Sequence, residues 1–408
     1  MRLDSFTKNS LIIFLASGIG NFINLLYQWF IVRLVTPETF ASLSSLLSLL
    51  AIFILPFSAF ATMVTKHVSC FNAQKDQDSL RSIWQVLARH AFFFSFIIFL
   101  PVVIFSSSIS RFLYIESRAS VIILGSIIFV SGIGSVISGG LQGLEKFKIL
   151  AILSLIAGLL KLVSPFVLLK FFAQLEGALL GFLAPMIFGI IISIPLVWSL
   201  FKKAKPTRVN TRELYFYILP VFAASLIFLL LTNFDMVLVK HFFILQAQDY
   251  AVAQLFGKIL LFLPGWIYLV MFARVSSLHA QKQSSKTVLK STLLFSLLPG
   301  LLVTIIFNLF PELAFGILAH RHSPQIIILG RVFSFSMLIF AMVNTLFYYQ
   351  LSVERFNFLL PSALITAFVF LLLWFWHISV LWVAGMLLVA SVCILIINLR
   401  SAFNAVLI

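Results

Sequence analysis

Charged residues are scarce in this sequence. Only 10% of its 408 residues are Asp, Glu, Lys or Arg, whereas 62% are hydrophobic and the mean hydropathy is +1.14. Soluble domains carry about 25% charged residues and could not bury so much apolar surface. The scarcity of charge therefore excludes a soluble protein and predicts a chain that lies in a lipid bilayer.

Cysteine and acidic residues are also few. Cys70 and Cys393 are the two cysteines, far apart in sequence, so neither a disulfide framework nor a cysteine-based metal site is expected. The 12 acidic residues include no obvious carboxylate pair for catalysis. No nucleophile stands beside a histidine, and no glycine-rich P-loop is present. We therefore expect a protein that is not an enzyme and has no metal or organic cofactor.

Long apolar stretches, in contrast, run through the whole chain. A helix needs about 20 apolar residues to cross about 30 Å of hydrocarbon. We predict an all-α integral membrane protein with about twelve transmembrane helices, the first of which is not a cleaved signal. The predicted segments are residues 10–32, 40–65, 90–110, 120–142, 149–170, 177–200, 215–239, 250–273, 289–310, 326–349, 357–376 and 379–399.

The distribution of cations predicts the orientation. With the N-terminus in the cytoplasm, nineteen of the 28 Lys and Arg residues fall on the cytoplasmic side and six on the opposite side. This asymmetry follows the positive-inside rule and places both termini in the cytoplasm. The net charge of +16 is then explained by loops that face anionic lipid headgroups. We do not expect a nucleic-acid partner.

The two halves of the chain resemble each other. Asn24 and Asn233 are 209 residues apart, as are Glu145 and Glu354, whereas Pro56 and Pro264 are 208 apart. We therefore predict two six-helix repeats that enter the membrane in the same direction, related by an axis along the membrane normal. The predicted domains are an N-terminal lobe at 1–201, a cytoplasmic linker at 202–213 and a C-terminal lobe at 214–408.

Three further local patterns have structural interpretations. The similar runs QGLEKFK (142–148) and QLSVERFN (350–357) are either helix ends with a cation in the headgroup layer or a hinge between transport states. Small residues every four positions favour close helix packing; they are Ser131, Ser135, Gly139 and Gly143. Prolines inside the segments predict kinks, at Pro56, Pro101, Pro165, Pro185, Pro264 and Pro299.

Several of these stretches resemble a known family. The run GNFINLLYQWFIVRLVTPETFASLSSLLSLLAIF, the turn GGLQGLEKFK and the six-plus-six layout are similar to polysaccharide flippases of the multidrug/oligosaccharidyl-lipid/polysaccharide (MOP) exporter superfamily. The glycine usual in relatives after the aromatic of the Pro-Glu turn is Ala41 here. The resemblance implies a V-shaped, MATE/MOP-like bundle in the bacterial inner membrane. It also implies outward movement of undecaprenyl-diphosphate-linked oligosaccharide by alternating access, with a polysaccharide polymerase and a chain-length regulator as candidate partners.

Ionisable residues within the spans are candidate site residues, because each costs a few kcal/mol at the centre of a bilayer. Lys161 and Lys258 lie near the middle of their spans, one in each half, and Arg331 lies nearer the outer surface. Cations in a partly desolvated cavity could hold a diphosphate group. Alternatively, they extend to the interface or pair with a carbonyl or an acid. Arg33 and Lys240, at outer helix ends, are interpreted as interfacial anchors.

Asp235 is the one acid deep within a span. A carboxylate there could bind Na⁺ or carry a proton, and the resemblance implies ion coupling by such a group on the seventh helix. The alternative is an ion pair with Arg331 or Lys258. Asn233 and its repeat mate Asn24 either line the same cavity or form hydrogen bonds between helices.

Three functions are compatible with these features. The first is a flippase for a polyprenyl-diphosphate-linked glycan, with Lys161, Lys258, Arg331, Asn24 and Asn233 as substrate-binding residues. The second is a multidrug or metabolite antiporter on the same scaffold, although exporters of organic cations need acids in their cavity. The third is a membrane-bound polymerase or glycosyltransferase, which usually has a larger outer loop. The residues favour the first.

Overall fold

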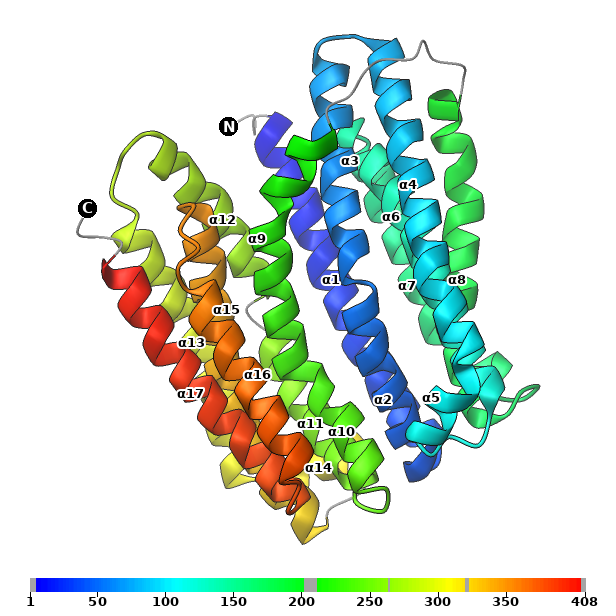
Figure 1. Cartoon of the computed structure of the whole chain (residues 1–408), viewed down its shortest axis with the longest axis vertical. Helices are drawn as coiled ribbons and strands as arrows, with labels where there is room; N and C mark the ends of the chain where they lie inside the picture. The colour runs from blue at the N-terminus through cyan, green and yellow to red at the C-terminus, as the bar shows by residue number, and fades with distance from the viewer. Residues whose placement is uncertain (1–4, 202–210, 263–264, 320–322, 405–408) are drawn as a thin grey trace. The chain divides into compact units, whose positions relative to one another are not determined.

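The structure, a computed structural model, describes residues 5–201, 211–262, 265–319 and 323–404 (Figure 1). In these ranges the chain contains helices and turns and no β-strand. It divides into two compact units: unit 1 consists of Met1–Ile31 and Leu49–Phe222, and unit 2 consists of Val32–Ser48 and Ala223–Ile408. Most of the predicted linker, residues 202–210, lies outside the described residues, so the predicted lobe boundaries stay predictions.

Every predicted transmembrane segment coincides with one helix or with consecutive helices. In the first half these are α1 (Ser5–Leu34), α2 (Pro37–Phe53), α3 (Leu55–Ala73), α4 (Gln77–Ile104), α5 (Ser106–Phe112), α6 (Arg118–Gly143), α7 (Phe147–Leu168) and α8 (Gln174–Leu196), followed by a 3₁₀ turn, Trp198–Phe201. In the second half they are α9 (Thr211–Leu229), a π-helical turn (Leu230–Phe234), α10 (Asp235–Phe242), α11 (Ala247–Phe262), α12 (Gly265–Ala280), α13 (Lys286–Leu309), α15 (Pro324–Ser352), α16 (Leu359–Phe375) and α17 (Val380–Asn404). A further short helix, α14 (Pro311–Ala319), lies between two predicted segments.

Nine helical spans of the described chain are long and apolar enough to cross a membrane, and α16 is a shorter apolar helix. The all-α membrane fold predicted from composition is confirmed. The total of twelve spans and the cytoplasmic position of the termini stay predictions.

Unit 1 is built around α6, which packs against α3, α4 and α8, while α7 packs against α8. Small residues bring α6 close to α3: a Cβ atom at Gly139 would lie 2.7 Å from the Ala61 carbonyl oxygen, and one at Gly143 would lie 2.6 Å from Val68 Cβ. The predicted close packing is confirmed at these two glycines. At Ser131 and Ser135, however, the hydroxyls bond to carbonyls of their own helix.

Unit 2 repeats this arrangement with α15 at its centre. Helix α15 packs against α12, α13 and α17, and α16 packs against α17. A buried cluster at one end of the unit includes Met271, Val275, Leu289 and Tyr349. Each of these four helix pairs has its counterpart in unit 1, and the short helices α5 and α14 follow equivalent spans, so the internal repeat predicted from the 209-residue offset is confirmed.

The repeated runs QGLEKFK and QLSVERFN both form a helix end. Glu145 and Glu354 have positive φ values of 58° and 55°. The amide that follows each glutamate bonds back five residues, Lys146 N to Leu141 O (2.9 Å) and Arg355 N to Gln350 O (3.0 Å). This is a Schellman motif, which satisfies the last carbonyls of a helix and is usually built on glycine.

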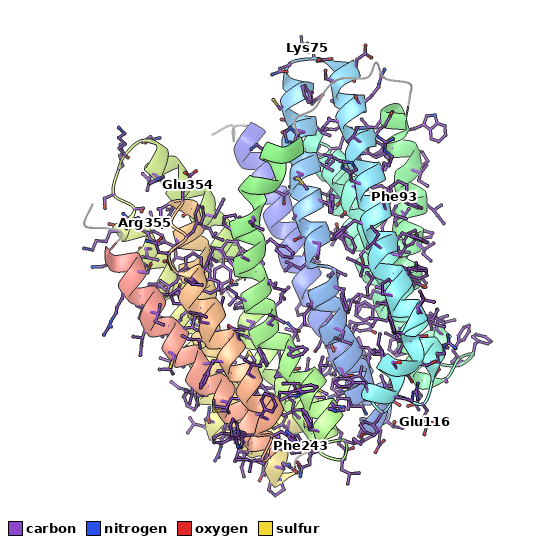
Figure 2. All side chains as sticks on the ribbon, in the orientation of Figure 1. Lys75, Phe93, Glu116, Phe243, Glu354 and Arg355 are labelled. Carbon is purple, nitrogen blue, oxygen red and sulfur yellow. The ribbon has the colours of Figure 1, made fainter. Side chains whose placement is uncertain are left out.

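The same motif occurs at the turns after α3 and α12. Lys75 and Lys282 have φ values of 57° and 56°. Figure 2 shows Lys75 and Glu116 at opposite ends of unit 1, and Glu354 and Phe243 at opposite ends of unit 2. Which of these ends faces the cytoplasm stays a prediction from the cation distribution.

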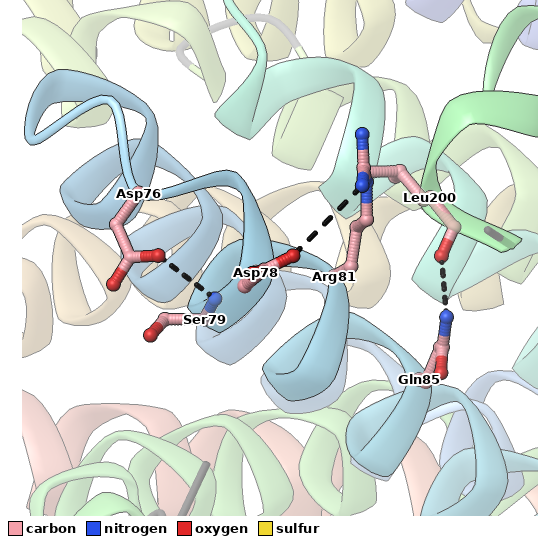
Figure 3. Close-up of polar contacts among 6 residues, drawn as sticks. All are labelled: Asp76, Asp78, Ser79, Arg81, Gln85 and Leu200. Carbon is pink, nitrogen blue, oxygen red and sulfur yellow. Dashed lines mark hydrogen bonds and ion pairs between the residues drawn. The ribbon is translucent and has the colours of Figure 1, made fainter. Parts of the chain in front are cut away.

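Side-chain caps define where several helices begin. Asp76 accepts a hydrogen bond from Ser79 N (3.1 Å) at the start of α4, and hydrogen bonds from Ser79 lower the pKa of the Asp76 carboxyl (Figure 3). One turn further, Arg81 pairs with Asp78 at 4.0 Å. Gln85 Nε2 donates to Leu200 O (2.9 Å), which ties α4 to the 3₁₀ turn after α8.

Proline interrupts the second span of the first half. Helix α2 ends at Phe53 and α3 begins at Leu55, because Pro56 has no amide hydrogen for the helical ladder and Phe57 N bonds instead to Ile54 O (3.0 Å). The other predicted prolines of the described chain lie inside helices that continue past them, namely Pro101, Pro165, Pro185 and Pro299. Pro264 lies outside the described residues.

Candidate functional site

Unit 1 contains a lysine held by neutral groups, which we call the Lys161 cluster (Asn24, Tyr27, Lys161 and Phe182). The Lys161 ammonium of α7 donates to Asn24 Oδ1 of α1 at 2.7 Å. It also lies 3.7 Å from the ring centroid of Phe182 and 4.7 Å from that of Tyr27. A cation over an aromatic face gains about 0.5–2 kcal/mol, so the two rings and the amide fix the position of the ammonium.

The two rings are themselves held in place by contacts within unit 1. Tyr27 of α1 and Phe182 of α8 meet edge to face, with centroids 4.7 Å apart. The Tyr27 hydroxyl donates to Ala178 O at 3.3 Å, and its side chain is only 1% exposed. Side chains of α1, α7 and α8 thus form a socket for one amine.

The charge of Lys161 is not balanced by an acid nearby. In the part of the chain that the structure describes, no carboxylate oxygen lies within 4.0 Å of its ammonium. Its partners are an amide and two aromatic rings, none of which carries a net charge. When its amine is protonated, the Lys161 cluster therefore carries one positive charge within a membrane span, which suits it to hold an anion.

Unit 2 contains a second polar group, the Asp235 cluster (Asn233, Asp235, Tyr250, Gln254 and Lys258). The Asp235 side chain is completely buried. Its Oδ2 accepts from the Tyr250 hydroxyl at 2.8 Å, and Gln254 Nε2 lies 2.9 Å and 2.8 Å from Oδ1 and Oδ2. Lys258 Nζ donates to Asn233 Oδ1 at 3.0 Å and interacts electrostatically with Asp235.

The local fold of the seventh span explains why these groups meet. Residues Leu230–Phe234 form a π-helical turn, which inserts one extra residue per turn and is common at functional sites. The turn carries Asn233 and leads directly into Asp235. On α11, Tyr250, Gln254 and Lys258 are four residues apart and therefore share one helix face. That face meets the Asn233–Asp235 segment.

The two clusters are related by the repeat, but only in part. Asn24 and Asn233 are repeat mates, and each accepts a hydrogen bond from a lysine ammonium. The lysines come from helices that are not equivalent, α7 in unit 1 and α11 in unit 2. The position in unit 1 that corresponds to Asp235 is Leu26. An acid therefore accompanies the lysine in unit 2 only.

The other sequence candidates lie apart from these clusters. Arg331 is exposed on α15, and its guanidinium has no hydrogen bond or ion pair within the described residues. Neither of the two proposed ion pairs with Asp235 is present within 4.0 Å in the described chain, although Lys258 lies close enough to interact electrostatically with the carboxylate. Arg33 donates to Ile317 O. The interpretation of Lys240 as an interfacial anchor is wrong, because it is only 3% exposed and interacts with Glu38.

Sequence reasoning missed four members of the clusters. Tyr250 and Gln254 could have been found from the sequence, because they precede Lys258 at four-residue spacing and so mark one polar face of an apolar helix. Tyr27 and Phe182 could not have been found in this way, because 15% of the chain is aromatic and nothing in the sequence distinguishes these two rings from the others.

Three comparisons place the chain among known proteins. The family described as polysaccharide biosynthesis protein matches residues 6–275. A search of curated proteins finds no match. Solved structures of the same fold include an inward-facing multidrug resistance MATE family transporter of the MOP superfamily, with a TM-score of 0.73 and 13% identity over 96% of this chain and 98% of that one.

Two other structures show the same likeness. Lipid II flippase MurJ in an inward closed conformation has a TM-score of 0.72 and 13% identity, over 96% of this chain and 87% of that one. An outward-facing MATE family transporter has a TM-score of 0.66 and 12% identity, over 98% and 95% of the two chains. These likenesses confirm the MATE/MOP-like fold that the resemblance implied. Because the family profile spans well over half of the sequence, the chain belongs to the polysaccharide biosynthesis protein family.

Proposed function

We propose that this protein is a flippase that moves undecaprenyl-diphosphate-linked oligosaccharide from the cytoplasmic to the outer leaflet of the bacterial inner membrane. It is a multi-pass membrane protein of a polysaccharide biosynthesis family with a transporter fold. The observation that carries the proposal is the Lys161 cluster, an amine in a span that has an amide and two rings as partners and no carboxylate within 4.0 Å in the described chain. A diphosphate supplies the missing anion.

The chemistry of the cargo fits this arrangement. Its diphosphate carries about two negative charges, and charge-assisted hydrogen bonds to lysine are the strong kind. Lys161 and Lys258 are the proposed ligands, with Asn24 and Asn233 positioning them and Arg331 as a further cation nearer the outer surface. Movement follows alternating access of the two repeats, and Asp235 is the proposed site for coupling to H⁺ or Na⁺.

A proteoliposome assay tests the proposal. The full chain is reconstituted, and leaflet exchange of a defined undecaprenyl-diphosphate-linked oligosaccharide is measured. Lys161→Met and Lys258→Met should each slow exchange by roughly tenfold to a hundredfold, because each removes a charge-assisted hydrogen bond worth about 1.5–3 kcal/mol. Lys170→Met is the matched control, since Lys170 is an exposed cation just beyond the end of α7.

The same vesicles separate the proposal from its alternative. The multidrug or metabolite antiporter on this scaffold would move an organic cation against a proton or sodium gradient and would not need either lysine. Exchange of the lipid-linked glycan at the rate of empty vesicles, together with gradient-driven uptake of a cation, would replace the flippase proposal with the antiporter.

A further inference from the structure

The two lysines differ in how their charge is balanced. Lys161 has only neutral partners, whereas Lys258 lies in the field of Asp235. With both groups ionised, the Asp235 cluster is neutral overall and the Lys161 cluster carries one positive charge. An anion should therefore bind readily at Lys161 but gain little at Lys258 while Asp235 is ionised.

The contacts of Asp235 leave Lys258 available as a ligand. Both carboxylate oxygens accept hydrogen bonds from Tyr250 and Gln254 at 2.8–2.9 Å, and no ion pair within 4.0 Å joins the carboxylate to Lys258 in the described chain. The Lys258 ammonium instead bonds to the Asn233 amide oxygen, and the side chain is half-buried rather than buried. Asp235 thus compensates the charge of Lys258 without occupying its donors.

The cluster can also accept a proton while Asp235 keeps both of its neighbours. A phenol is both a donor and an acceptor. If Asp235 is protonated, its hydroxyl can donate to the Tyr250 oxygen, while Gln254 continues to donate to the other carboxyl oxygen. The Tyr250–Asp235 and Gln254–Asp235 contacts therefore both persist, with the first reversed in direction, so the geometry suits a proton better than a metal ion, which would need these oxygens as ligands.

Other charged groups near Asp235 do not substitute for Lys258. On its own helix, Lys240 interacts with Glu38 of α2. Helix α17 packs against α10, and its one charged residue, Arg400, lies near its C-terminal end. Helix α15, which packs against α11, places Phe333 against Tyr250, with ring centroids 5.0 Å apart.

We propose that Asp235 is a proton switch for Lys258. When Asp235 is ionised, Lys258 is compensated; when Asp235 takes up a proton, Lys258 becomes a free cation that binds the diphosphate of the cargo, whereas Lys161 binds it in either state. This inference rests on the proposed function and specifies the sign of the coupling between proton binding and cargo binding. Proton and cargo bind cooperatively in unit 2, in contrast to a competitive exchanger, where each would displace the other.

Binding of geranyl diphosphate, a soluble prenyl diphosphate, to the full chain in nanodiscs tests the switch. The Lys161→Met background isolates unit 2. In that background we compare the protein that has Asp235 with the one that carries Asp235→Asn. As the pH is lowered, the dissociation constant of the protein with Asp235 should fall by about tenfold relative to that of Asp235→Asn. Asp235→Asn should bind tightly at every pH, and Lys258→Met should remove the binding. Because the two proteins are compared at the same pH, the change in the ionisation of geranyl diphosphate affects both equally and does not contribute to the difference.

Tyr250→Phe provides a second measurement that does not depend on Asp235→Asn being folded. It removes a donor to the carboxylate, so the rise in affinity should move to higher pH. The switch is overturned if Asp235→Asn and its parent show the same pH dependence, or if Na⁺ tightens binding only when Asp235 is present. If wild type does not bind the probe at any pH, the proposed function fails as well; if it binds without any effect of Asp235, only the switch fails.

Discussion

The bond between Asn24 and Lys161 leads to a quantitative prediction about stability. A lysine at the centre of a span costs about 2.5–3.5 kcal/mol to insert. In unit 1 this cost is offset by a 2.7 Å bond to Asn24, worth about 1.5–3 kcal/mol, and by two ring contacts at about 0.5–2 kcal/mol each. At the middle of these ranges the contacts exceed the cost by about 2 kcal/mol, so Lys161→Met should lower the free energy of unfolding by no more than about 2 kcal/mol.

Asn24→Leu should behave differently, because it leaves the ammonium in place and removes its one strong partner. We expect a loss of about 1.5 kcal/mol, at the low end of the range since Asn24 is itself exposed. In the Lys161→Met background the same substitution should have almost no effect. The two substitutions are therefore non-additive by about 1.5 kcal/mol, which a double-mutant cycle measures directly.

Equilibrium unfolding of the full chain in mixed detergent micelles provides the four free energies. The matched control is Asn233→Leu combined with Lys161→Met, since Asn233 bonds to a different lysine and this pair should be additive. Additive effects of Asn24→Leu and Lys161→Met would refute the reasoning, because they would mean that the ammonium does not depend on the amide. A large loss for Lys161→Met alone would refute it too, by showing that the lysine has a structural role.

Two further predictions concern packing and turns. Gly139→Ala should destabilise the protein by about 1–3 kcal/mol, because its Cβ would overlap the Ala61 carbonyl. Gly134→Ala on the same helix is the control: its Cβ would meet only a side-chain atom at 3.9 Å, so it should be neutral or slightly stabilising. The same unfolding titration checks both substitutions, and equal effects would contradict the close α3–α6 contact. Glu145→Gly should stabilise the end of α6 by about 0.5–1 kcal/mol, since glycine adopts positive φ without strain. That gain should appear as slower hydrogen exchange in the last turn of α6, and its absence would argue against the Schellman geometry.

Much of the fold could be predicted from the sequence because bilayer physics acts on short windows. A run of about 20 apolar residues needs no tertiary information to be recognised as a span. The repeat was visible because a few landmarks, such as Glu145 and Glu354, recur at one offset, and the structure shows both in the same turn conformation. The break before Pro56 was likewise predictable from a missing amide hydrogen.

The site could be predicted only as a set of separate candidates. Lys161, Lys258 and Asp235 stood out because ionisable groups in a membrane are costly. Nothing in their spacing indicated that Lys161 meets Asn24, 137 residues away, or that Asp235 is held by Tyr250 and Gln254. The misinterpretation of Lys240 has the same origin, since a helix end looks interfacial in sequence until neighbouring helices cover it.

The sequence by itself determined that this chain lives in a membrane, that it is built twice from one helical unit, and which few charges it retains within the lipid. These properties follow from composition and from periodicity along a single helix. Only the tertiary structure decided which of those charges are balanced. Compensation depends on distances between helices, and the π-helical turn before Asp235 and the aromatic socket around Lys161 set those distances through packing that one-dimensional patterns do not encode.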